Sequence, residues 1–262
     1  MRSPVEQPGA PAHVLRVVDA TKRFGAIVAV DAVSFDLGRG EILAVLGDNG
    51  AGKSTLIKCI SGAHRLDSGT IHVDGSPAQI RTPADARRHG IETVYQDLAL
   101  FDELDVAANL FAGREIATSR GPAWAGWVNS RRMRAQARET LDDLAVNVPS
   151  LRASVKLLSG GQRQAVSVAR AVQFATRLVI LDEPTAALGV RETRNVLRLI
   201  RQLPERGVSV IVISHNLDHV SEIADRAIVI RRGRKVGEAR PDAAGHEQIV
   251  SMIVGARAAP TT

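Results

Sequence analysis

The sequence predicts an α/β fold with a mostly parallel core sheet, an N-terminal antiparallel β-subdomain and an inserted helical subdomain. Residues 13–95 contain short runs in which apolar and polar residues alternate before turns, as in hairpin strands. Residues 97–160 carry a helical pattern, which we assign to the inserted subdomain. Residues 161–236 alternate between strand and helix patterns, which is typical of a parallel sheet.

The composition is that of a folded domain with a sizeable core. The chain has 262 residues, of which 45% are hydrophobic and 24% charged, an ordinary balance for globular proteins. No apolar run approaches the roughly 18 residues of a membrane span, and the N-terminus lacks the apolar region of a signal peptide. We expect a disordered lead-in at residues 1–12, one domain at 13–255 and a frayed tail at 256–262.

Charge and cysteine content restrict the partners and the compartment. The net charge of +6 is compatible with nucleic-acid binding. Arginines are scattered, however, and only 3% of the residues are aromatic, so no stacking platform is evident and we expect no nucleic-acid partner. Cys59 is the single cysteine, which excludes an intrachain disulfide and fits a reducing cytosol.

Turn and cap residues mark the ends of several elements. Alternating apolar residues at 33–37 precede a Gly-Arg-Gly turn, and the segment "TIHVDG" ends at an Asp-Gly turn. Thr82 followed by Pro83 predicts the start of a helix, and Gly90 predicts its end. The stretch 130–146 has the clearest amphipathic helical pattern, and "GHEQIVSMIVG" predicts a short helix near the C-terminus.

A phosphate-binding loop follows the apolar strand predicted at residues 42–46. The loop fits G-x-x-x-x-G-K-[ST] and precedes a helical pattern. Its glycines let the backbone wrap around phosphate oxygens, and the following helix adds its positive N-terminus. We expect Lys53 to reach the β- and γ-phosphates and Ser54 to bind Mg²⁺. The loop consists of Gly47, Asp48, Asn49, Gly50, Ala51, Gly52, Lys53, Ser54 and Thr55.

Two carboxylates end a second apolar strand, predicted at residues 178–181. A nearly continuous apolar run fits a parallel strand that is buried on both faces. Charges at its tip are costly unless they have a function. We expect Asp182 to bind Mg²⁺ beside Ser54, and Glu183 to polarise the water that attacks the γ-phosphate. The alternative is a solvated pair that merely caps the strand.

A second glycine-rich turn, Leu-Ser-Gly-Gly-Gln at residues 158–162, opens a helix. Ser159 is a suitable N-cap, and apolar residues recur at helical spacing between Ala165 and Val172. The N–H groups of Gly160 and Gly161 offer an anion site, but one Mg-nucleotide needs only one loop. We therefore expect the turn to close over the γ-phosphate held by a partner subunit; the alternative is a simple helix cap.

With these motifs the sequence resembles the ATP-binding-cassette (ABC) ATPases over about residues 13–255. The resemblance implies a P-loop NTPase fold that binds and hydrolyses ATP with Mg²⁺. It assigns Phe24 to stacking on adenine, Gln96 to contacts with Mg²⁺ and water, and His215 to the γ-phosphate. Taken alone, each of these three would be an ordinary structural or surface residue. The signature motif of the family matches Ser159, Gly160, Gly161 and Gln162. The implied catalytic residues are Glu183, His215, Gln96 and Lys53, and the implied metal ligands are Ser54, Gln96 and Asp182.

The resemblance also implies a head-to-tail dimer. Two ATP molecules would lie between the phosphate-binding loop of one subunit and the signature turn of the other. One position departs from the family pattern, because Gly189 stands where the family usually has an aspartate. A glycine cannot supply the carboxylate that normally helps to couple the two sites.

The helical subdomain contains a stretch, residues 97–113, that is more apolar than a solvated loop. Its side chains either pack the subdomain or line a groove for a short helix of a membrane permease, which the resemblance implies near residues 97–104. The apolar side chains concerned are Leu98, Leu100, Phe101 and Leu104. Trp124 and Trp127 lie in a Gly- and Pro-punctuated segment, which we expect to be a surface loop without an assigned function.

Several strings resemble the ATPase subunits of monosaccharide importers, the ribose, xylose and fructose group. They are "GAHRLDSGTIHVDG", "EPTAALGVRE", "ISHNLDHVSEIADRAIVIRRGR" and "EQIVSMIVG". This resemblance implies a peripheral ATPase at the cytoplasmic face of the plasma membrane. Its partners would be ATP, a second copy of the chain, permease subunits and, indirectly, a sugar-binding protein. A homodimer is the simplest arrangement, because one cassette is visible.

Two other functional classes share some of these motifs. A soluble cassette ATPase without a permease would serve iron–sulfur assembly or DNA repair. The long coiled-coil insertion of repair proteins is missing, and the strings of the sugar group disfavour the assembly class. A regulatory module that senses ATP without turnover is disfavoured by Glu183 and His215, which hydrolysis requires.

Overall fold

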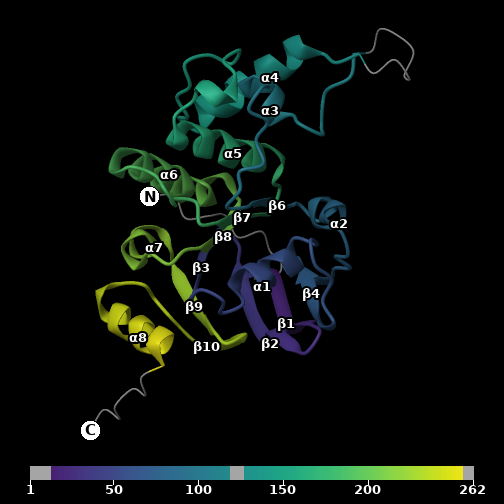
Figure 1. Cartoon of the computed structure of the whole chain (residues 1–262). Coiled ribbons are helices and arrows are strands. Elements are labelled where there is room, and N and C mark those ends of the chain that lie inside the picture. Colours follow the sequence, from purple (N-terminus) through teal and green to yellow (C-terminus); the bar gives the residue numbers. More distant parts are fainter. Residues whose placement is uncertain (1–12, 119–126, 256–262) are drawn as a thin grey trace.

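The computed structural model describes residues 13–118 and 127–255. The lead-in expected at 1–12, the tail expected at 256–262 and Trp124 lie outside the described residues. A helical group lies at one end of the molecule and an antiparallel sheet at the other, with the core sheet between them (Figure 1). No helix within the described ranges is both long and apolar enough to cross a membrane.

The N-terminal sheet is antiparallel, with the strand order β2-β1-β4-β5. Its strands are β1 (His13–Phe24), β2 (Ile27–Gly38), β4 (Ser68–Val73) and β5 (Ser76–Pro77). Val33, Phe35 and Leu37 are buried, as their alternation predicted. Asp74 and Gly75 both have positive φ and form the tight turn between β4 and β5.

The core sheet has the strand order β10-β9-β3-β8-β7-β6 and is parallel except for the β10–β9 pair. Its strands are β3 (Ile42–Leu46), β6 (Ile91–Val94), β7 (Leu178–Asp182), β8 (Ser209–Ile213), β9 (Arg226–Arg231) and β10 (Arg234–Ala239). Every residue of β3, β7 and β8 is buried, which explains their continuous apolar runs. These three strands are parallel neighbours, so their carboxyl ends meet at one edge.

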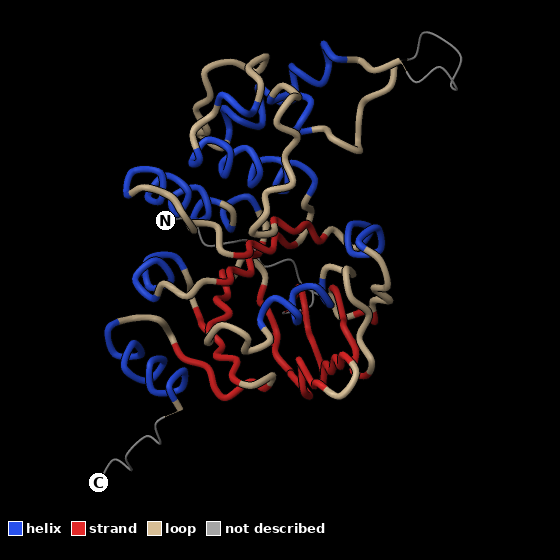
Figure 2. Tube along the Cα trace, viewed as in Figure 1, coloured by secondary structure: helices blue, strands red, loops and turns tan. Residues whose placement is uncertain are grey.

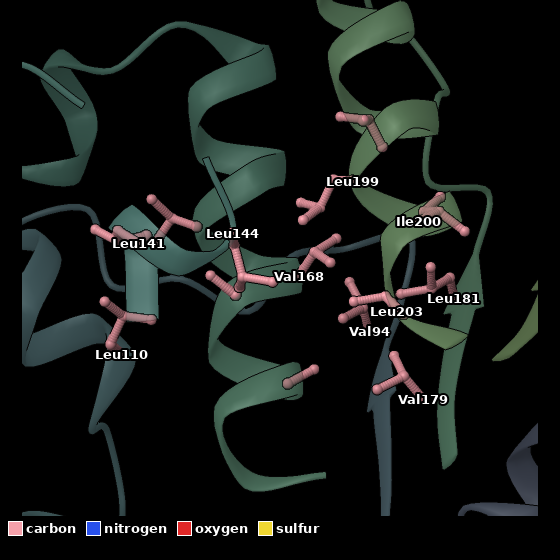
Figure 3. Close-up of a cluster of buried hydrophobic side chains, with 14 of the residues drawn as sticks. Val94, Leu110, Leu141, Leu144, Val168, Val179, Leu181, Leu199, Ile200 and Leu203 are labelled. Carbon is pink, nitrogen blue, oxygen red and sulfur yellow. The ribbon is translucent and has the colours of Figure 1, made fainter. Parts of the chain in front are cut away.

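Helices cover one face of the core sheet, and the other face packs on α1 and the N-terminal sheet (Figure 2). Val179 and Leu181 of β7 belong to the cluster packed by α5 and α6 (Figure 3), whereas Leu178 and Ile180 belong to the cluster shared with α1. This alternation is the two-residue period of a strand buried on both sides. The helices around the sheet are α1 (Lys53–Ile60), α2 (Pro83–Arg88), α5 (Gly160–Phe174), α6 (Val190–Gln202), α7 (Leu217–Ile223) and α8 (Ala243–Val254).

The helical subdomain is less helical than the pattern over 97–160 predicted. It contains α3 (Val106–Leu110), α4 (Ser130–Asp143) and a 3₁₀ turn (Val155–Leu157), and residues 97–105 contain no helix. Met133, Ala137 and Leu141 are buried along one stripe of α4, as its amphipathic pattern predicted. A second 3₁₀ turn (Pro204–Arg206) follows α6.

The predicted boundaries of α2 are confirmed. The Thr82 side chain accepts a hydrogen bond from the Asp85 N–H, and the Asp85 side chain accepts one from the Thr82 N–H, which forms a capping box. Pro83 occupies the first helical position, where its missing N–H is not needed. Gly90 follows the helix with a φ of 75°. Local side-chain chemistry therefore determines where this helix begins and ends.

Candidate functional site

An open cleft of about 760 Å³ lies at the edge where β3, β7 and β8 end. It brings together residues that are distant in the sequence, among them Gly47 and His215, which are 168 positions apart. The predicted site residues that line it are Gly47, Asp48, Asn49, Gly50, Ala51, Gly52, Lys53, Ser54, Thr55, Gln96, Asp182, Glu183 and His215. The carboxyl edge of a parallel sheet is where such folds bind ligands.

Close backbone packing explains two glycines of the loop between β3 and α1. A Cβ on Gly47 would lie 2.0 Å from the Ile230 carbonyl oxygen, and one on Gly52 would lie 2.3 Å from the Ala29 carbonyl oxygen. Both glycines also have positive φ, 145° and 105°. Gly52 is the N-cap of α1, and no side chain caps that helix. The first N–H groups of α1 are thus available to an anion in the cleft.

Lys53 crosses the inside of this loop. Its Nζ donates hydrogen bonds to the carbonyl oxygens of Gly47 at 2.7 Å and Asp48 at 2.9 Å. The side chain is buried, and desolvation lowers the pKa of Lys53, an effect that Glu183 and Asp182 oppose by Coulomb attraction. A buried ammonium attracts a phosphate strongly, because the low local dielectric strengthens the Coulomb interaction, and it also offsets the repulsion between the phosphate and the two carboxylates.

Asp182 ends strand β7 and is buried. Burial raises the pKa of Asp182, and the neighbouring Glu183 charge raises it further. A hydrogen bond from the Ser54 side chain and the charge of Lys53 act in the opposite direction on this pKa. A carboxylate held in this way is destabilised in its charged form, and a bound cation would relieve that cost.

Glu183 and His215 form a direct pair. The Nδ1 atom of His215 lies 3.0 Å from the Glu183 carboxylate. The Glu183 N–H donates a hydrogen bond of 3.0 Å to the Ile213 carbonyl, so the residue is fixed against β8, two positions before His215. Glu183 has a φ of 52°, an uncommon value for a residue with a side chain. Strained backbone of this kind concentrates at functional sites.

The second glycine-rich turn lies outside the lining of this cleft. Ser159 caps α5 and forms a capping box with Gln162, whose N–H it accepts at 3.2 Å. Together with Gly161 these residues line a separate cavity of about 510 Å³ between α5, α6 and residues 144–147. Gly160 is exposed beside them. The helix cap is confirmed. Because the turn lies outside the cleft, an anion bound at the turn would not be one that the same chain holds in its cleft.

Phe24 is not among the residues that line the cleft. It is 45% exposed at the end of β1 and makes an edge contact with His64 at 5.2 Å between ring centroids. The base-stacking role of Phe24 stays a prediction.

Sequence reasoning missed part of the lining of the cleft. These residues come from β2, from the turn after β9 and from α8: Ile27, Val28, Ala29, Arg232, Gly233 and Ile253. The Gly233 N–H donates to the Ala51 carbonyl at 2.8 Å, so this turn supports the loop.

The apolar stretch near residues 97–104 divides between the two expected roles. Leu98 and Leu100 pack against the core, whereas Phe101 is 56% exposed and Leu104 is 42% exposed. Asn109, which sequence reasoning missed, holds this stretch in place. Its fully buried amide accepts from the Phe101 N–H at 2.7 Å and donates to the carbonyls of Phe101 at 3.0 Å and Leu104 at 3.3 Å.

The arrangement can hold a polyphosphate and place a base beside it. The glycine loop and α1 supply N–H donors, Lys53 supplies a cation, and Glu183 with His215 forms an acid–base pair. Gln96 follows β6 by two residues and lines the same cleft. This set of groups suits attack of water on a phosphate.

Comparison with known proteins agrees with this chemistry. The sequence profile described as ABC transporter matches residues 30–186. The fructose import ATP-binding protein of Rhizobium meliloti is 47% identical over 94% of this chain and 96% of its own. The xylose/arabinose import ATP-binding protein of Sulfolobus acidocaldarius is 43% identical over 92% and 93%. A ribose import ATP-binding protein of Rubrobacter xylanophilus is 46% identical, and this chain spans 47% of its length.

Solved structures show the same fold. A nucleotide-free ATP-binding cassette from an ABC transporter superposes with a TM-score of 0.80 at 25% identity and covers 92% of this chain. A dimeric ABC transporter cassette superposes with a TM-score of 0.72 at 22% identity, which concerns the fold alone. The profile covers more than half of the chain and includes the loop around Lys53 and the pair Asp182–Glu183. The chain therefore belongs to the ABC transporter family, and it is an ATP-hydrolysing cassette of that family.

Proposed function

We propose that this chain is the ATPase subunit that powers import of a sugar, bound peripherally at the cytoplasmic face of the plasma membrane. The relatives named for fructose, xylose/arabinose and ribose import support this substrate class. The observation that carries the proposal is the 3.0 Å contact between His215 and Glu183, in the cleft that also contains Lys53. It puts a base beside the space that a γ-phosphate bound by Lys53 would occupy.

The phosphates of ATP would bind the loop from Gly47 to Thr55. Lys53 would exchange its two carbonyl partners for phosphate oxygens, which as charged acceptors form stronger hydrogen bonds. Phe24 would stack on the adenine if it turned toward the cleft. Asp48, Asn49, Gly50 and Ala51 would contribute backbone contacts around the phosphates.

The donor set also fits Mg²⁺. The Ser54 hydroxyl, the Gln96 amide and the Asp182 carboxylate offer the oxygen ligands that Mg²⁺ prefers. Within the described residues no group of three or more His, Cys, Asp and Glu side chains could hold a metal, so the ion would depend on the substrate phosphates as well. When bound, Mg²⁺ neutralises charge on the phosphates.

Hydrolysis then needs a positioned water. The water oxygen attacks the γ-phosphorus while the bond to the β–γ bridging oxygen breaks, and the products are ADP and inorganic phosphate. Glu183 accepts the hydrogen bond of the water and orients it, and His215 bridges this carboxylate and the γ-phosphate. Lys53 stabilises the charge that moves to the phosphate oxygens.

A second copy of the chain would complete each site. Ser159, Gly160, Gly161 and Gln162 lie outside the cleft and offer a helix N-terminus to an anion. In a head-to-tail dimer this turn would cover the γ-phosphate bound by the partner. Closure would move the permease subunits docked near residues 97–104, where Phe101 and Leu104 are exposed. A sugar-binding protein would deliver the sugar to that permease.

Sugar uptake by cells tests the proposal. We expect cells in which Glu183→Gln replaces the native chain to lose uptake of one sugar in a panel of fructose, xylose, arabinose and ribose. Glu205→Gln, which changes an exposed carboxylate after α6, serves as the matched control and should leave uptake unchanged. Phe101→Ser with Leu104→Ser should also abolish uptake while the purified protein still hydrolyses ATP. Normal uptake of all four sugars in the Glu183→Gln strain would contradict the proposal.

A further inference from the structure

Both glycines of the signature turn contact the segment that follows Glu183. A Cβ on Gly160 would lie 3.6 Å from Leu188 Cδ2. A Cβ on Gly161 would lie 2.3 Å from Glu192 Cγ and 2.5 Å from Glu192 Cβ. The first turn of α5 therefore packs so closely on the first turn of α6 that position 161 has no room for a side chain.

The Glu192 side chain lies between two helix N-termini. Its methylene groups cover Gly161, the second residue of α5, and its Oε2 would lie 2.6 Å from a Cβ on Gly189, the N-cap of α6. Helix N-termini carry partial positive charge, so two that converge repel each other. A carboxylate between them offsets this repulsion, and no side chain caps α6 at Gly189.

The same segment begins in the chain's own cleft. The Ala186 N–H donates to the Glu183 carbonyl at 3.1 Å, and Ala186 lines the cleft. Ala187 has a φ of 58°, a strained value for alanine. Residues 183–192 thus connect the cleft to the turn that the proposed function offers to the partner's nucleotide. This connection consists of the contacts of Leu188 and Glu192 with the two glycines, and it does not require a carboxylate at position 189.

We propose that Glu192 is a positioning residue that sets the signature turn for the nucleotide of the partner subunit. The inference rests on the proposed function, because it assumes the head-to-tail dimer. Glu192 acts through Gly161 and the N-terminus of α5, and it compensates for the missing carboxylate at Gly189. Loss of its side chain weakens closure of the dimer and leaves binding of ATP to the chain's own loop unchanged.

The experiment measures dimer formation in a background that does not hydrolyse ATP. Glu183→Gln, alone or with Glu192→Ala, Glu192→Gln or Glu205→Ala, is titrated with Mg-ATP in the analytical ultracentrifuge. We expect Glu192→Ala to raise the dimer dissociation constant about tenfold, the size of a coupling between residues in contact. Glu192→Gln keeps the length of the side chain and should have a smaller effect in the same direction. Glu205→Ala is the matched control and should behave as the parent.

Two further readouts separate positioning from simple loss of folding. Calorimetric affinity of the monomer for ATP should be equal in all four proteins. The midpoint of thermal unfolding of Glu192→Gln should lie only slightly below that of the parent, because the side chain keeps its length and loses only its charge. If Glu192→Ala and Glu192→Gln dimerise as well as the parent, or if monomer affinity for ATP falls with dimerisation, the inference is overturned. If the parent itself stays monomeric with Mg-ATP, the proposed function fails instead.

Discussion

At the scale of single residues, the site combines groups that would be unfavourable without a ligand. Lys53 and Asp182 are both buried. Desolvation lowers the pKa of Lys53 and raises the pKa of Asp182, so it favours the neutral form of each side chain. Glu183 adds a third charge and a strained backbone. A site that stores such costs is prepared for a charged substrate, because binding of phosphate and cation would offset them.

Replacement of Glu183 by glutamine should separate catalysis from binding. The amide keeps the shape of the side chain but cannot act as a base toward water. We expect the turnover number to fall about 100- to 10,000-fold, the usual contribution of a general base, with nearly unchanged affinity for ATP. Steady-state ATPase assays and calorimetry measure the two quantities. An equal loss of affinity would instead assign Glu183 to substrate binding.

Replacement of Asp182 by asparagine should stabilise the protein without nucleotide. The pKa of Asp182 is raised in the folded state, so its stabilising contribution is present below the unfolded pKa, about 3.9, and is lost as pH rises through the folded pKa. Asparagine does not titrate, so we expect a higher melting temperature than wild type at pH 7 and no gain near pH 3. Thermal unfolding followed by circular dichroism at the two pH values measures this. A lower melting temperature at pH 7 would contradict the burial argument.

Sequence reasoning reached most of the site at this scale because the motifs are contiguous strings with defined chemistry. The loop around Lys53 and the pair Asp182–Glu183 do lie in one cleft. It could not find Asn109, whose role depends on backbone carbonyls that only the fold brings near its amide. The stacking of Phe24 on adenine rests on the resemblance alone and stays a prediction; in the structure its ring lies beside His64.

At the scale of elements, the phosphate-binding loop is held between strands from both sheets. Gly47 approaches β9 and Gly52 approaches β2, each at a distance that only a residue without Cβ permits. The patterns of β3 and α1 predicted a strand–loop–helix unit, and the apolar run before Asp182 predicted β7; both predictions are confirmed. The approach of β2 and β9 could not be predicted, since contacts between distant segments leave no local signal.

A single methyl group at position 47 should therefore destabilise the ligand-free protein. Gly47→Ala puts a Cβ 2.0 Å from the Ile230 carbonyl, and alanine also disfavours the φ of 145°. We expect a loss of more than about 2 kcal/mol in the free energy of unfolding, measured by urea titration. Gly50→Ala is the matched control, because it has positive φ but open space around a Cβ, and should cost about 1 kcal/mol. Equal losses in both variants would show that the close approach to β9 is unimportant.

At the scale of the whole molecule, the phosphate-binding loop and the signature turn lie in different cavities. The cleft contains the loop, Asp182 and His215, and the turn at Ser159 lines a separate cavity. The number and order of the motifs allowed a shared site to be predicted from the sequence. The helical subdomain was predicted less well, because residues 97–105 have an apolar pattern but are held by Asn109 without forming a helix.

The most direct test of shared sites mixes two inactive variants. Lys53→Ala removes the loop lysine, and Ser159→Phe blocks the signature turn. A mixed dimer has both lesions in one site and neither in the other, so an equal mixture should regain about a quarter of wild-type ATPase activity, given half of the dimers mixed and one of two sites intact. If the mixture is as inactive as its components, although mixed dimers are detected by mass, each chain does not complete the site of its partner.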